Sequence, residues 1–199
     1  MHRVEQNKIN GHMAATAAVR QFAEIMHREL GPLELAGAHW VIGDSAGEHL
    51  KFMPEGIALW SDGIEKQIIA WSRLMDFGLQ TQPGKFASSK GLERATKIIT
   101  DLAGLPNGGN GGSRVGATLR HPYIDWTANF DHHSRKYSRH HIKLVDEFLR
   151  QVVERKMASR LGDPEWMSAA VGKLSQMPAS GSRRRSRKTF IEGLLSDCG

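Results

Sequence analysis

The chain has 199 residues, of which 40% are hydrophobic, and a formal net charge of +6. This composition supports a packed core in one domain with additions or in two small domains, and it excludes a wholly disordered protein. The single cysteine, Cys198, excludes an intrachain disulfide and a multi-cysteine zinc framework. Segment 1–10 lacks the apolar region of a secretory signal, and no run of about 18 apolar residues occurs. We therefore expect a cytoplasmic protein without integral membrane association.

The positive charge is concentrated in the second half of the chain. Residues 1–104 contain 11 Lys and Arg against 12 Asp and Glu, whereas residues 105–199 contain 16 against 9. Such asymmetry is typical of a protein that engages an acidic partner, such as nucleic acid, an anionic surface or an acidic protein patch. A basic surface that is only solvated is the alternative that the composition leaves open.

The first half of the chain predicts a helix followed by a meander. Apolar residues recur at helical spacing over Ala14–Leu30, and Gly31-Pro32 is expected to stop that helix. Short apolar runs separated by turn signals then predict antiparallel strands. Asp62-Gly63 suits a tight hairpin turn. The expected strands are His39–Ile42, Glu48–Met53, Ile57–Trp60, Ile64–Trp71 and Leu74–Leu79.

The second half of the chain predicts a further helix, a hairpin and then helices. An inserted helix is expected over Ser88–Leu102, followed by a Gly-rich loop at 104–113. Strands are expected at Val115–Arg120 and Trp126–His132, the second because it alternates apolar and polar residues. The sequence thus continues the antiparallel pattern of the first half.

The longest predicted helix is Arg139–Leu161, with Ser138 as its N-cap and Gly162 at its end. Asp163 is expected to cap another helix that begins at Pro164. The segment Ala179–Lys188 is interpreted as a tail of Ser, Gly and Arg, with one short helix over Thr189–Leu195.

These elements predict an α+β fold. It comprises an N-terminal helix, a bent antiparallel sheet of about five to seven strands with an inserted helix, and closing C-terminal helices. We divide the chain into a helical segment 1–36, an α+β domain 37–161, and a C-terminal helix with a basic tail at 162–199.

The stretch "PEGIALWSDGIEKQIIAWSRLMDF" resembles the pattern of bacterial pleckstrin-homology-like domains. In that pattern a strand such as Gly56–Trp60 leads through a turn to a strand that ends in a tryptophan and a basic residue, here Trp71 and Arg73. The resemblance covers residues 38–160 and implies a bent antiparallel sheet closed by a C-terminal helix, here Arg139–Leu161. It also implies a binding or scaffold module and names no ligand.

Two basic segments are candidate sites for nucleic acid or another anion. The segment "HHSRKYSRHH" combines cations with an aromatic side chain that we expect to be exposed, and it runs into a helix N-terminus. The segment "SGSRRRSRK" offers cations for phosphate contacts. The candidate residues are Arg135, Lys136, Tyr137, Arg139, Arg183, Arg184, Arg185, Arg187 and Lys188.

The histidines suggest a different class of protein, a metal-dependent enzyme. Imidazole and carboxylate groups ligate zinc, iron or manganese, and the alternative ligand set is His121, Asp131, His133 and His141. Adjacent histidines diverge on a strand or a helix, and the neighbouring arginines would repel a cation, so we expect no metal or other cofactor. The preferred hypothesis is a non-enzymatic binding or regulatory module whose basic half engages an acidic partner, most directly nucleic acid. A scaffold that forms a homodimer through an apolar helix face is the third alternative.

Overall fold

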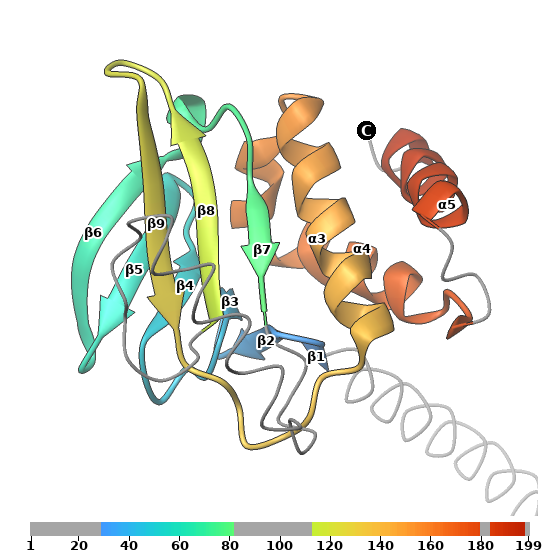
Figure 1. Cartoon of the computed structure of the whole chain (residues 1–199), viewed down its shortest axis with the longest axis horizontal. Coiled ribbons are helices and arrows are strands. Elements are labelled where there is room, and N and C mark those ends of the chain that lie inside the picture. The colour runs from blue at the N-terminus through green and yellow to red at the C-terminus, as the bar shows by residue number, and fades with distance from the viewer. Residues whose placement is uncertain (1–28, 82–112, 180–183, 198–199) are drawn as a thin grey trace, which may run out of the picture.

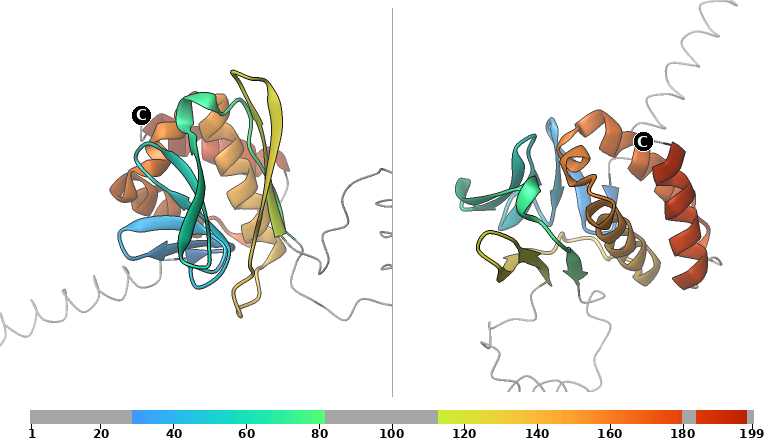
Figure 2. Two further views of the ribbon diagram at one scale, coloured as in Figure 1. Left: turned by 90° about the vertical axis from the view of Figure 1, so that its left-hand side faces the viewer. Right: turned by 90° about the horizontal axis from the view of Figure 1, so that it is seen from above.

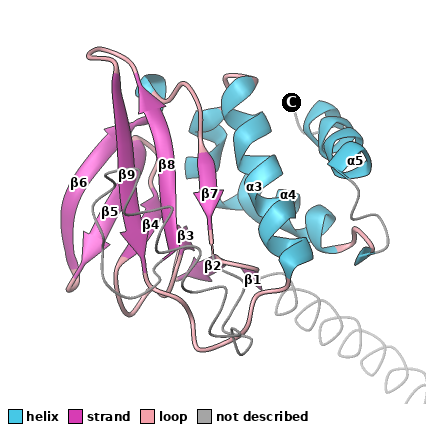
Figure 3. Cartoon of the chain, in the orientation of Figure 1, coloured by secondary structure: helices cyan, strands magenta, loops and turns pink. Residues whose placement is uncertain are grey.

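The computed structural model describes residues 29–81, 113–179 and 184–197. The first antiparallel sheet runs in the order of the chain and consists of β1 (Glu29–Leu30), β2 (Leu33–Ala36), β3 (His39–Ile42), β4 (His49–Phe52), β5 (Gly56–Ser61) and β6 (Ile64–Ala70). The second, also in chain order, consists of β7 (Gly78–Gln80), β8 (Ser113–Leu119) and β9 (Ile124–Phe130). The helices are η1 (Trp71–Arg73), α3 (Arg139–Glu154), η2 (Ala158–Gly162), α4 (Pro164–Ser175) and α5 (Arg184–Asp197). The predicted α+β class is confirmed (Figures 1 and 3).

The two sheets form a wedge that α3 closes. Seen from above in Figure 2, the sheets make two sides of the wedge, and α3 lies along its open side, with α5 on the far side of α3. Alternating burial along β8 and β9 turns one face of the second sheet into this interior. A single hydrophobic cluster of the described residues extends from Leu30 in β1 to Leu195 in α5.

The β1–β2 hairpin corrects the expected first helix. Glu29–Leu30 is a strand, and Leu30 pairs with Leu33 around Gly31, which adopts a φ of +59°. The Gly-Pro pair therefore makes a hairpin turn and does not stop a helix. Residues 14–28 of the expected helix, the helix Ser88–Leu102 and the Gly-rich loop up to residue 112 lie outside the described residues.

The later strands largely follow the sequence. The Asp62-Gly63 turn has positive φ at both positions, 56° and 70°, as the expected tight hairpin requires. Leu74–Leu79 is not a strand throughout. Leu74 forms an isolated bridge with Leu119, and regular pairing begins only at Gly78.

The helix α3 begins as predicted and ends earlier than predicted. The Ser138 hydroxyl accepts a hydrogen bond from the His141 backbone N–H at 3.0 Å, which satisfies one free donor of the first turn. The helix ends at Glu154 instead of Leu161. Lys156 adopts a φ of +61°, and the next N–H groups donate back to carbonyls of the last turn. This is a Schellman ending, where glycine is usual, and a lysine there costs about 1 kcal/mol.

The C-terminal segment is helical where the sequence suggested a tail. Asp163 caps α4 as predicted, and its carboxylate accepts hydrogen bonds from the N–H groups of Glu165 and Trp166. The helix α5 includes the predicted short helix but begins at Arg184 and packs on α3. None of the helices in the described ranges is both long and apolar enough to cross a membrane.

Candidate functional site

Arg135 ties the β1–β2 hairpin to the segment that follows β9. Its guanidinium lies 3.0 Å from Glu29 Oε2 and 3.2 Å from Glu34 Oε2, and it donates to the carbonyl oxygens of Gly31 and Leu33 at 3.3 Å. An external anion would have to compete with two carboxylates for this guanidinium. The contacts favour a structural role for Arg135.

Tyr137 is buried, so the expectation that it is exposed is wrong. Only 6% of the residue is accessible. Its hydroxyl accepts from the His133 backbone N–H at 3.0 Å and also contacts His133 Nδ1, while His133 Nε2 lies 2.5 Å from Glu34 Oε2. A neutral His133 with its proton on Nε2 satisfies this network, because Tyr137 then donates to Nδ1. The ring therefore anchors the segment and is not available to stack on a base.

A serine–histidine pair lies beside this network. Ser113 Oγ and His132 Nε2 are 2.5 Å apart, and the His132 ring stacks on Tyr137 with centroids 5.1 Å apart. A hydroxyl next to an imidazole is the arrangement of a nucleophile and its base. Ser113 is fully buried, however, and so cannot meet a substrate in this structure. We assign the pair to positioning the start of β8.

The alternative metal ligands are not brought together. His121 lies in the β8–β9 turn, Asp131 accepts the Glu48 backbone N–H at 2.8 Å, and His133 is bound to its two partners. His141 is in the first turn of α3, and burial is the main cause that lowers its pKa. Across residues 29–81, 113–179 and 184–197, no three His, Cys, Asp or Glu side chains are grouped as metal ligands.

The remaining cations of the first basic segment are Lys136 and Arg139, and both are exposed. Lys136 lines a hollow of about 560 Å³ beside β1, together with Glu29, Arg135 and His141. Because one of its two cations is already paired with carboxylates, this hollow has little net positive charge.

The predicted cations of the second basic segment divide into exposed and buried residues. Arg184, Arg185 and Lys188 are exposed on α5, whereas Arg187 is buried, with 7% accessible. Arg187 lies near Asp146 of α3, and its charge favours the ionised carboxylate, although burial is the larger effect and raises the Asp146 pKa. Arg183 lies outside the described residues.

Hydrophobic and polar contacts fix α5 to the body of the protein. Ile191, Leu194 and Leu195 are buried against the core. The Gln151 side-chain amide of α3 donates to the Lys188 carbonyl at 3.3 Å. The exposed cations of α5 therefore occupy set positions.

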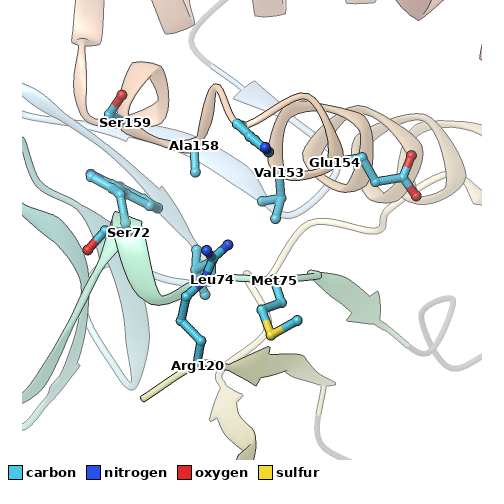
Figure 4. Close-up of a pocket in the computed structure, with 10 residues that line it drawn as sticks. Ser72, Leu74, Met75, Arg120, Val153, Glu154, Ala158 and Ser159 are labelled. Atoms are coloured by element: carbon cyan, nitrogen blue, oxygen red, sulfur yellow. The ribbon is translucent and has the colours of Figure 1, made fainter. Parts of the chain in front are cut away.

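A third basic region, which the sequence did not indicate, surrounds a hollow of about 430 Å³. It lies between η1, the β8–β9 turn and the C-terminal end of α3 (Figure 4). Arg120 and Lys156 line it, and they are separated by 35 residues. No short motif links them, so only the fold reveals this hollow.

The comparisons with known proteins give no match. No family model matches the chain, and neither curated proteins nor solved structures match it.

Three histidines, of which His133 is buried and His132 and His141 are partly buried, make stability depend on pH. Burial is the main cause that lowers the pKa of His132, His133 and His141 in the folded chain. In the unfolded chain the histidine pKa is about 6.5. Below this pH the unfolded chain binds protons that the folded chain does not bind, so the free energy of unfolding falls as the pH decreases. The slope is at most about 1.4 kcal/mol per pH unit for each histidine, and less for partly exposed rings.

Urea unfolding between about pH 7.5 and pH 5.5 measures this dependence. Glu48 and Asp146 have raised pKa values, mainly through burial, and oppose the trend at the acidic end. His141→Gln should flatten the curve. A free energy of unfolding that stays constant or rises on acidification would contradict the account.

Proposed function

We propose that this protein is a non-enzymatic binding module that engages nucleic acid through its basic C-terminal half. One observation carries the proposal: Arg184, Arg185 and Lys188 of α5 are exposed to solvent, while other residues hold the same helix on the core, namely Arg187, Ile191, Leu194 and Leu195. Because phosphate contacts by such side chains release counterions, they supply affinity without reading bases.

The placement of these cations is unfavourable for the isolated protein. Arg184 and Arg185 lie in the first turn of α5, which contains no acidic residue. The positive end of the helix dipole disfavours cations there. A bound phosphate backbone would offset this repulsion. The position of these cations therefore favours binding of an anionic partner over the stability of the free protein.

The alternatives have less support from the described residues. The metal-dependent enzyme needs ligands that are dispersed across the fold. The homodimer needs an unpartnered apolar helix face, but the apolar stripes of α3 and α4 are buried in their own chain. A fold of the pleckstrin-homology-like type remains part of our proposal, because a closing helix after an antiparallel sheet suits a binding module.

Fluorescence anisotropy with a labelled DNA duplex tests the function. Three to five phosphate contacts predict a slope of about −3 to −5 for log K against log salt. The first three contacts come from α5, and Lys136 and Arg139 are candidates for the others. The variant Arg184→Ala/Arg185→Ala should make the slope less steep by about 2.

The matched control is Lys66→Ala/Arg114→Ala, which removes the same charge from β6 and β8, on the opposite side of the molecule from α5 (Figure 1). It should leave the slope unchanged. Either of two results refutes the proposal: no binding at about 50 mM salt, where attraction is strong, or equal loss in both double variants.

A further inference from the structure

We propose that the hollow lined by Arg120 and Lys156 binds a nucleoside monophosphate. Cationic side chains at the site would hold the phosphate, and its apolar wall would hold the base. None of the residues that line the hollow belongs to α5, and the proposal does not rest on the function proposed above. Its volume, about 430 Å³, is within the range of small-molecule sites.

Arg120 supplies a donor that has no use within the described protein. Its Nε is buried and has no hydrogen-bond partner among the described residues. Figure 4 shows the side chain extending into the hollow from the end of β8, between Ser72 and Met75. Buried polar groups are normally hydrogen-bonded, and an unsatisfied donor at a hollow points to a missing acceptor.

The backbone of Arg120 is held firmly against η1. Its N–H donates to the Arg73 carbonyl at 2.9 Å, and Arg73 Nε donates back to the Arg120 carbonyl at 3.1 Å. This reciprocal pair fixes the Arg120 backbone, from which the side chain enters the hollow. Because the backbone is already in place, less conformational freedom is lost when an anion binds.

Lys156 occupies a position that stability alone would give to glycine. It is the left-handed residue of the Schellman ending of α3, with a φ of +61°, and it lines the hollow. Strained backbone that persists at a site is a reason to look for function there. Unlike glycine, Lys156 supplies a positive charge that can pair with a phosphate.

The remaining charges around the hollow favour an anion. Glu154 also lines it, but its carboxylate forms an ion pair with Arg150. Arg155 and Arg160, which adjoin lining residues in the chain, are exposed. The last carbonyls of α3 accept hydrogen bonds from the Schellman turn, which weakens the negative end of the helix dipole.

The apolar lining selects an organic phosphate over the bare ion. Met75, which is 43% exposed, contributes carbon surface beside the cations, over a floor of nearly buried apolar residues: Trp71, Leu74, Val153 and Ala158. The Trp71 indole N–H already donates to the Met53 carbonyl at 2.9 Å, so it needs no hydrogen-bond acceptor from a ligand. A ligand that suits this lining has a dianionic phosphate for the cations and a flat, largely apolar ring system for the apolar residues. A nucleoside monophosphate is such a molecule.

Isothermal titration of the full chain with AMP, adenosine and inorganic phosphate tests the proposal. AMP should bind at least about tenfold more tightly than either fragment. The variants Arg120→Met and Lys156→Gly should each weaken AMP binding by about tenfold or more, since each removes one cation from the phosphate. Lys66→Ala on β6 is the control and should bind AMP like the original chain.

Lys156→Gly separates binding from folding. Glycine relieves the left-handed strain, so this variant should have a higher thermal unfolding midpoint while it loses AMP affinity. Undetectable AMP binding at about 1 mM, equal affinity for AMP and adenosine, or unchanged affinity in both variants would each overturn the proposal. Arg184→Ala/Arg185→Ala should retain AMP binding, so failure here is distinguishable from failure of nucleic-acid binding by α5.

Discussion

Replacing Phe148 by alanine should lower the free energy of unfolding by about 3–5 kcal/mol, the usual range for a buried phenylalanine. Phe148 lies near the middle of α3 and is fully buried. Its ring stacks on Trp166 of α4, with centroids 5.9 Å apart and planes inclined by 24°. The smaller side chain would leave a cavity between two helices whose positions are fixed on both sides, so the site cannot collapse to fill it.

Urea unfolding measures this loss, and Tyr123→Ala is the matched control. Tyr123 is 70% exposed in the β8–β9 turn, so truncation of this second aromatic ring should change stability by less than about 0.5 kcal/mol. A loss below about 1 kcal/mol for Phe148→Ala would mean that the ring is not buried and that α3 is wrongly assigned.

The sequence predicted α3 well at one end because a local signal marks that end. Ser138 has a side chain that caps a helix, and it does so here. The other end has no such signal, because Lys156 stands where a glycine would have marked the stop. The sequence therefore predicted that the helix ends next to Gly162, the first glycine after its start. Helix ends set by a strained residue cannot be recognised from local preference.

The sequence predicted a short helix over Thr189–Leu195, but the earlier part of α5, from Arg184, was hidden by its composition. Its buried residues Arg187, Ile191, Leu194 and Leu195 recur at helical spacing, but the first of them is an arginine. A run of arginines predicts a solvated tail, and only the tertiary structure shows that Arg187 is buried, with the charge of Asp146 on α3 acting on it. Removal of residues after Met177 would thus delete part of the core as well as the basic surface.

The candidate sites depended even more on tertiary contacts. Arg135 and Tyr137 were chosen for their residue types, yet Glu34 of β2 pairs with Arg135 and also with His133, the residue that binds the Tyr137 hydroxyl. A strand 101 residues away from Arg135 in the chain decides its role. The same reasoning explains why the Arg120 hollow was missed, since Arg120 and Lys156 line one hollow only when α3 closes the wedge of sheets.

Two glycine substitutions with opposite expected effects test how η2 and α5 pack. A Cβ added at Gly162 would lie 2.3 Å from the Met53 carbonyl oxygen and 2.8 Å from Pro54 Cα, both of which belong to the backbone. Gly162→Ala must push η2 away from the β4–β5 connection, so it should lower the free energy of unfolding by more than about 2 kcal/mol. A Cβ at Gly193, on the exposed side of α5, meets nothing within 4 Å.

Gly193→Ala should therefore raise the free energy of unfolding by about 0.5–1 kcal/mol, because alanine loses less backbone freedom than glycine in a helix. Both variants add one methyl group, so urea unfolding of the pair compares a close backbone contact with an open helix surface. Equal effects of the two changes would contradict the contact of η2 with Met53. A loss of stability in Gly193→Ala would contradict the helical conformation of α5, and with it the fixed arrangement of Arg184, Arg185 and Lys188 on which the proposed nucleic-acid surface depends.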